Sequence, residues 1–212
     1  MPIGNPRAFQ IKRSDRVFIV GTTGSGKTSL AKAMLYGLPS VIVLDPKRTF
    51  TLPDDWEHEI YTDFGQLTNH DTPVTAIYRP TIEEMEKGCE KFFEFVFERR
   101  NTTVYIDEVM RVTNGPRIGR GYATVLQLGR ERGVSCWSAT QRPANIPLVV
   151  MTESEHYFVF RLRNIEDRKR MATFTDFQEL EKIPKDEHGF YYFNDRSGKL
   201  IYYKRAKIEK GS

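Results

Sequence analysis

The chain has 212 residues and a net charge of +4, and 28% of its residues are charged and 39% hydrophobic. This length allows one domain with a substantial core, and the composition excludes a disordered or fibrous protein. No apolar run approaches the ~18 residues of a membrane-spanning helix, and residues 1–15 lack the apolar segment of a secretory signal, so we expect no membrane span and a cytoplasmic location.

Cysteine and histidine usage indicates neither a disulfide framework nor a zinc site. Cys89 and Cys136 lie in segments that we expect to be buried, so we predict free thiols in the core. The four histidines show no ligand spacing and stand at positions 58, 70, 156 and 188. Because no Cys-x-x-Cys pair exists either, a zinc ion held by the protein is not expected.

The first predicted element after an N-terminal arm (residues 1–15) is a buried strand, Val17–Val20. The eight residues that follow, GTTGSGKT, fit the phosphate-loop pattern G-x-x-x-x-G-K-[ST] at every fixed position. Residues 29–35 then predict a helix, which completes the strand–loop–helix context that the motif requires.

The residue types in this loop suit a bound polyphosphate. Its glycines allow backbone angles at which successive N–H groups point inward, and the helix that follows adds its positive N-terminal dipole. Lys27 is expected to reach the β and γ phosphates, and the Thr28 hydroxyl to bind Mg²⁺. The predicted nucleotide site therefore comprises Gly21, Thr22, Thr23, Gly24, Ser25, Gly26, Lys27, Thr28 and Ser29. The alternative, a turn without ligand, is disfavoured because eight-residue matches in this context are uncommon by chance.

Further strands and helices alternate along the chain. Residues 40–46, SVIVLDP, predict a strand buried on both faces, residues 47–72 are polar and expected to be irregular, and residues 73–80 predict a third strand. Thr81 and Glu84 form a capping-box pattern, and apolar residues at 3–4 residue spacing then predict one amphipathic helix up to about Arg100.

The second half continues the alternation. Residues 102–106, 134–141 and 156–160 predict strands, residues 122–132 and 164–174 predict helices, and residues 110–121 form a loop rich in glycine and arginine. Residues 189–193 and 199–203 predict a β-hairpin within a C-terminal extension, residues 176–212. The pattern predicts an α/β fold with a mostly parallel sheet.

Two strand ends carry polar residues that suit nucleotide hydrolysis. The strand at residues 102–106 is followed by Asp107, which fits a carboxylate that supports Mg²⁺, and by Glu108, which fits a general base for an attacking water. Gln141, at the end of the strand 134–141, could hydrogen-bond the γ-phosphate or that water. Solvated carboxylates and ordinary strand-end polarity are the alternatives.

The stretch GRERGV at residues 129–134, running into SATQRP at residues 138–143, resembles FtsK–HerA superfamily ATPases, as does the strand VIVLDP. The resemblance covers about residues 16–170, and the motifs occur in the order of that superfamily. In size the chain is similar to the genome-packaging ATPases of tailless, internal-membrane-containing viruses of bacteria and archaea.

The resemblance implies a RecA-like P-loop NTPase fold of the ASCE type, with residues 16–175 as the ATPase core. It further implies hydrolysis of ATP with Mg²⁺, sequence-independent translocation of double-stranded DNA and a homo-oligomeric ring, a pentamer or hexamer. Candidate further partners are capsid vertex proteins, and the location would be the host cytoplasm or the virion.

The resemblance also implies roles for single residues. Lys27 and Thr28 would bind phosphates and Mg²⁺, and Asp107 would support Mg²⁺. Glu108 would be the base and Gln141 the sensor of the γ-phosphate. Arg130 aligns with the arginine that such ATPases offer to the nucleotide of the neighbouring subunit, and Arg132 is the alternative.

Arginines in the loop after the catalytic strand suit contact with DNA phosphates, and they are Arg111, Arg117 and Arg120. An ordinary surface loop is the alternative for this segment. Two other functions remain open: a small-molecule P-loop kinase, which Glu108 directly after Asp107 disfavours, and an ATP-dependent assembly or secretion protein that does not grip DNA.

Overall fold

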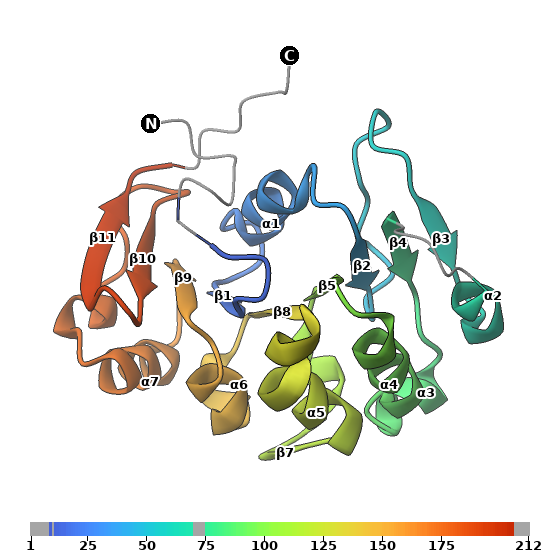
Figure 1. The fold of residues 1–212 in the computed structure, drawn as a ribbon. Helices are drawn as coiled ribbons and strands as arrows, with labels where there is room; N and C mark the ends of the chain where they lie inside the picture. Colours follow the sequence, from blue (N-terminus) through green and yellow to red (C-terminus); the bar gives the residue numbers. More distant parts are fainter. Residues whose placement is uncertain (1–8, 10, 70–74, 206–212) are drawn as a thin grey trace.

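The computed structural model describes residues 9, 11–69 and 75–205. Within them, nine strands form one sheet in the order β11-β10-β9-β1-β8-β5-β2-β4-β3 (Figure 1). The strands are β1 (Val17–Val20), β2 (Val41–Leu44), β3 (Glu59–Tyr61), β4 (Thr75–Tyr78), β5 (Thr103–Ile106), β8 (Ser135–Thr140), β9 (His156–Phe160), β10 (Phe190–Asn194) and β11 (Lys199–Tyr203).

The sheet is parallel from β3 to β9, and only β10 and β11 pair antiparallel with their neighbours. The strand β8 lies between the phosphate-loop strand β1 and the carboxylate-bearing strand β5. This additional strand is the arrangement expected of an ASCE-type P-loop NTPase. The predicted α/β fold, its mostly parallel sheet and its C-terminal hairpin are therefore confirmed.

Helices cover both faces of the sheet because successive strand residues point to opposite sides. α1 (Lys27–Leu35) packs on one face against a core that includes Val17 and Ile19. Residues Phe18 and Val20 point to the other face, on which Figure 1 places α4 (Glu90–Arg99), α5 (Arg120–Leu128) and α7 (Ile165–Thr175). The remaining helices are α2 (Phe64–Thr68), α3 (Ile82–Glu86) and α6 (Leu148–Thr152).

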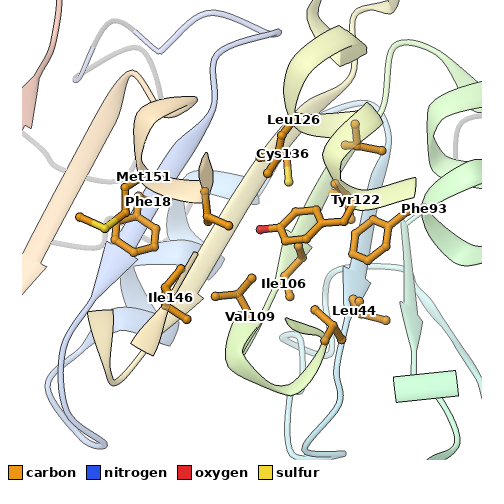
Figure 2. Close-up of a cluster of buried hydrophobic side chains, with 14 of the residues drawn as sticks. Phe18, Leu44, Phe93, Ile106, Val109, Tyr122, Leu126, Cys136, Ile146 and Met151 are labelled. Carbon is orange, nitrogen blue, oxygen red and sulfur yellow. The ribbon is translucent and has the colours of Figure 1, made fainter. Parts of the chain in front are cut away.

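Aromatic rings join α4 to α5 beneath the centre of the sheet. Phe93 stacks on Tyr122 with ring centroids 4.7 Å apart, and both side chains are fully buried. Figure 2 shows this pair beside Ile106 and Cys136 of the neighbouring strands. The Tyr122 hydroxyl and the Ser138 Oγ lie 2.7 Å apart and share a hydrogen bond, so the polar end of the buried ring is satisfied.

The prediction of one helix across residues 82–100 is wrong. The helix is interrupted between α3 and α4, where Gly88 and Cys89 have φ angles of +69° and +52°. These left-handed angles end the first helix and redirect the second. The capping box of Thr81 and Glu84 is present as predicted and begins α3.

The expectation of irregular structure at residues 47–72 is also wrong in part, because β3 and α2 lie there. The glycine- and arginine-rich loop contains a small hairpin, β6 (Thr113–Asn114) and β7 (Arg117–Ile118), and the connection before β9 contains α6. The helix predicted to reach Arg132 ends at Leu128 and continues as a 3₁₀ turn, Gly129–Arg132, in which the Gly133 N–H bonds to the Arg130 carbonyl three residues earlier.

The N-terminal arm contributes more to the core than its composition indicates. Phe9 is buried among rings of the C-terminal strands, with centroids 4.8 Å from Tyr192 and 5.6 Å from Tyr203. Asp15 is fully buried. The rest of the arm, residues 1–8 and 10, and His70 lie outside the described residues.

Cys89 and Cys136 are free and buried, as predicted. Burial raises the pKa of each thiol to about 12, so both stay protonated at neutral pH. Among the described helices, none combines the length and the apolar composition that a bilayer crossing requires.

Replacing Phe93 by alanine should lower the free energy of unfolding by about 3–5 kcal/mol, because it opens a cavity between α4 and α5. Phe97 on the same helix is only half-buried, so Phe97→Ala should lower it clearly less. Urea unfolding followed by far-UV circular dichroism measures both changes. Equal losses in the two variants would contradict this account of the core.

Candidate active site

The phosphate loop leads from β1 into α1 with a backbone that presents its amides. Gly24 and Gly26 have φ angles of +77° and +107°, which disfavour any residue with a Cβ. No side chain caps α1, and its first turn holds no acidic residue. The first N–H groups of a helix lack intrahelical partners and carry its positive dipole, so this end of α1 is suited to an anion.

Hydrogen bonds to neighbouring strands hold the loop in place. Gly21 N–H donates to the carbonyl of Thr140, at 3.2 Å, at the end of β8, and Thr22 N–H donates to the carbonyl of Arg161, at 2.9 Å, directly after β9. A Cβ on Gly21 would come within 2.6 Å of the Phe160 Cβ. The loop is therefore fixed between two parallel strands at their carboxyl ends.

Lys27 folds back over this loop. Its Nζ donates to the carbonyls of Gly21, at 2.6 Å, and Thr22, at 3.0 Å. Burial lowers the pKa of Lys27 to about 8, while the carboxylates of Glu108 and Asp107 act in the opposite direction. A polyphosphate bound here would favour the charged lysine.

Asp107 stands directly after β5 and is buried. Its Oδ2 lies 2.8 Å from the Lys47 Nζ, and its Oδ1 accepts hydrogen bonds from the Tyr105 hydroxyl at 3.1 Å and from the Thr28 Oγ1 at 3.5 Å. Burial, followed by the negative charge of Asp107, raises the pKa of Tyr105 well above its usual range.

The oxygen donors of Thr28 and Asp107 fit Mg²⁺, which prefers carboxylates, hydroxyls, water and substrate phosphates. The Lys47 ammonium at the carboxylate shows that this position attracts a cation. In the described part of the chain, no three His, Cys, Asp or Glu side chains gather around a common point as a protein-held metal would require. Mg²⁺ bound here would neutralise phosphate charge, with Thr28 and Asp107 as its protein-side partners.

Lys47 is not among the predicted site residues. It follows the motif VIVLDP, where the fully buried Asp45 closes the turn: Asp45 accepts hydrogen bonds from the backbone of Thr49 and Phe50 and from Arg79. This turn carries Lys47 to Asp107. The lysine could have been suspected only by knowing that β2 lies beside β5.

Glu108 and Gln141 flank the loop on the same side as Asp107. The Glu108 Oε1 accepts a hydrogen bond from the Thr140 Oγ1 at 2.8 Å, and only 4% of the residue is exposed. The Gln141 Oε1 accepts a hydrogen bond from the Thr23 Oγ1 at 2.9 Å. The structure thus brings two predicted catalytic residues to the phosphate loop from two different strands.

A cavity of about 320 Å³ lies in front of these groups. Its lining combines predicted residues with four that sequence analysis missed, and it consists of Thr23, Gly24, Gly26, Lys27, Thr28, Ser29, Lys47, Gln141, Phe160, His188 and Arg205.

The structure does not bring Arg130 and Arg132 to this cavity. Both precede β8, so they lie where the parallel strands begin, here called the amino edge of the sheet; the carboxyl edge is where these strands end. The six residues of β8 separate the two arginines from the phosphate loop by about 20 Å. Arg130 lies 3.6 Å from both Asp15 and Glu155. Arg132 is held more tightly, by a 2.7 Å contact with Glu98.

The three arginines predicted to contact DNA are exposed and follow β5 in the chain. Arg111 and Arg117 line a hollow of about 640 Å³ between α3 and the β6–β7 hairpin, together with Gly88 and Ile82. Arg120 begins α5 and lines a separate hollow beside Glu94 and Glu98. The structure therefore brings two of them together and leaves the third nearby.

Comparison with known proteins identifies relatives, although no family model matches the chain. It is 27% identical over 175 residues to the DNA translocase FtsK of Helicobacter pylori, across 67% of this chain and 20% of FtsK. It is 24% identical over 190 residues to the DNA packaging ATPase P9 of Enterobacteria phage PRD1, across 84% of this chain and 81% of P9. The chain thus spans about a fifth of FtsK and most of P9.

Among solved structures, the genome packaging NTPase B204 of Sulfolobus turreted icosahedral virus 2, in complex with ATP-γS, matches with a TM-score of 0.73. The identity is 17%, and the match covers 92% of this chain and 100% of B204, which shows a common fold. The resemblance to FtsK–HerA superfamily ATPases, and to viral packaging ATPases among them, is confirmed by these relatives.

Replacing Lys47 by methionine should lower the Mg²⁺ concentration that half-saturates the complex with the non-hydrolysable analogue AMPPCP. The change should be on the order of tenfold, because a competing ammonium leaves the Asp107 carboxylate. Calorimetric titration at saturating nucleotide measures it. Lys91→Met, which removes an equal charge from an exposed lysine of α4, is the control. An unchanged midpoint in Lys47→Met would contradict the competition.

Proposed function

We propose that this chain is an ATP-hydrolysing double-stranded DNA translocase, a subunit of a viral genome-packaging motor that works as a homo-oligomeric ring in the host cytoplasm or the virion. The observation that carries the proposal is the cavity at the carboxyl ends of the parallel strands, which the phosphate loop and Gln141 line. Asp107 accepts a hydrogen bond from Thr28 in its wall, and Glu108 accepts one from Thr140, which precedes Gln141. The similarity to packaging ATPase P9 and to FtsK supports it.

In this proposal the triphosphate lies on the amides of the phosphate loop. Lys27 leaves the carbonyls of Gly21 and Thr22 and binds the β and γ phosphates. Glu108 polarises the attacking water as general base, and its hydrogen bond to Thr140 fixes the carboxylate for that role. Gln141 bonds the γ-phosphate or that water, and its contact with Thr23 ties it to the loop.

The arginine finger must come from a second copy of the chain, because Arg130 lies at the opposite edge from its own phosphate loop. Arg130 suits this role better than Arg132: 47% of its side chain is exposed, against 27%, and its ion pairs are longer. An arginine that meets the charge on the transferred phosphoryl group increases turnover by about 10³–10⁵. A ring supplies one such contact at each interface.

DNA would be gripped without regard to sequence. Arg111, Arg117 and Arg120 lie exposed beyond the catalytic strand, and arginines so placed contact backbone phosphates. This segment directly follows Asp107 and Glu108. If it moves when the bound nucleotide changes from ATP to ADP, hydrolysis is coupled to translocation.

The kinase alternative requires an acceptor in place of water. The buried Glu108 suits a general base for water, and the similarity to packaging ATPase P9 and to FtsK favours water over an acceptor. The assembly or secretion alternative shares the ATPase site and differs only in its response to DNA.

Double-stranded DNA should therefore stimulate ATP hydrolysis, and the stimulation should fall steeply between about 50 and 200 mM salt because phosphate contacts release counterions. Replacing Arg111, Arg117 and Arg120 together by alanine should raise the DNA concentration needed for half-maximal stimulation. A control that removes three exposed charges elsewhere, Lys182, Lys185 and Lys199, should not. ATPase activity indifferent to DNA would favour the assembly or secretion alternative.

Mixing inactive subunits tests the arginine in trans. Arg130→Ala subunits keep an intact phosphate loop, and Lys27→Ala subunits keep an intact arginine. Mixed rings should therefore recover part of the ATPase activity at interfaces that combine the two intact halves. If the Arg132→Ala mixture recovers activity and the Arg130→Ala mixture does not, Arg132 is the finger instead.

A further inference from the structure

The C-terminal hairpin lies at the candidate active site, although it carries none of the predicted catalytic residues. β10 pairs antiparallel with β9, and β11 with β10, so that Phe160, Phe190 and Tyr203 lie side by side. Since β9 is parallel to β1, the start of β10 and the end of β11 both lie at the edge that holds the phosphate loop. His188, just before β10, and Arg205, just after β11, line the cavity for this reason.

The turn that carries His188 is built against the hairpin. The Tyr202 hydroxyl donates to the Asp186 carboxylate at 2.7 Å and accepts from the Asp186 N–H at 3.2 Å. A Cβ on Gly189 would come within 2.3 Å of that hydroxyl, so a side chain at this position would displace the turn. His188 is thus held in position beside the phosphate loop. Its Cβ lies 3.9 Å from the point where a side chain at Gly26 would place its own Cβ.

The ring nitrogen Nδ1 of His188 is buried and lacks a hydrogen-bond partner among the described residues. Buried polar atoms in proteins are almost always satisfied, by protein, water or ligand. The His188 residue lines a cavity whose other walls include the phosphate loop.

The strand order separates the two ends of the cavity. Lys47 and Gln141 come from the side of β2 and β8, together with Asp107 and Glu108, which is where the γ-phosphate must lie for hydrolysis. Phe160, His188 and Arg205 come from the side of β9, β10 and β11, across β1. A nucleotide with its γ-phosphate at the carboxylates therefore extends its nucleoside toward the hairpin.

We propose that His188 and Arg205 form the nucleoside subsite of this nucleotide-binding cavity. His188 hydrogen-bonds the nucleoside, and the planar Arg205 guanidinium lies against the base, as arginine does on aromatic faces. The inference rests on the proposed function, because it requires a nucleoside triphosphate in the cavity. It assigns the C-terminal hairpin a role in recognising the nucleotide, distinct from the chemistry at Glu108.

Two ligands separate the nucleoside end from the phosphate end. AMPPCP contains a nucleoside and a triphosphate chain, whereas inorganic tripolyphosphate contains the phosphates alone. Calorimetric titration of the full chain with Mg²⁺ should show that His188→Ala and Arg205→Ala each weaken AMPPCP binding by about tenfold. Tripolyphosphate affinity should change by less than about twofold, which also shows that the phosphate loop of each variant is folded.

His58→Ala and Lys204→Ala are matched controls. His58 bonds the Trp56 carbonyl, Lys204 is the exposed neighbour of Arg205, and neither residue lines the cavity. Both should keep wild-type affinity for AMPPCP. Wild-type AMPPCP affinity in His188→Ala and Arg205→Ala would overturn the inference, and so would an equal loss for both ligands. Failure of the wild-type chain to bind either ligand would overturn the proposed function itself.

Discussion

The phosphate loop is held between the carboxyl ends of β8 and β9 by two backbone hydrogen bonds, from Gly21 to Thr140 and from Thr22 to Arg161. This attachment fixes where the first turn of α1 points. The same attachment places Glu108 beside the loop, because the Thr140 hydroxyl donates a hydrogen bond to the Glu108 carboxylate. One strand end therefore positions both the anion-binding backbone and the carboxylate that would act on the bound phosphate, and every other functional group is placed relative to this point.

The parallel sheet has two chemically different edges. The carboxyl edge holds the cavity, with Asp107, Glu108, Gln141 and, from the antiparallel hairpin, His188 and Arg205. The amino edge holds Arg130, beside Asp15 and Glu155. Because a single copy keeps Arg130 away from its own Glu108, Arg130 could reach a bound phosphate only at the loop of a second copy. This geometry favours a ring, where each chain offers one edge to each neighbour.

Local patterns were enough to predict the parts of the site that lie within one short segment. The phosphate loop and the pair Asp107–Glu108 depend on a strand and the residues directly after it, and the α/β alternation follows from buried strands and amphipathic helices. Lys47 and His188 escaped prediction because each reaches the cavity through strand neighbours far away in sequence, β5 for Lys47 and β9 for His188. The break at Cys89 escaped because its apolar spacing continues the helical pattern while the backbone angles at Gly88 and Cys89 do not.

The central claim is that water, guided by Glu108, attacks the γ-phosphate of a nucleotide on this loop. Hydrolysis of ATP in ¹⁸O-labelled water, with mass spectrometry of the products, tests it most directly. The account predicts label in the released inorganic phosphate, none in ADP, and loss of labelled phosphate in Glu108→Gln while AMPPCP still binds. Label in ADP, transfer of phosphate to an acceptor without label, or undiminished hydrolysis in Glu108→Gln would contradict it.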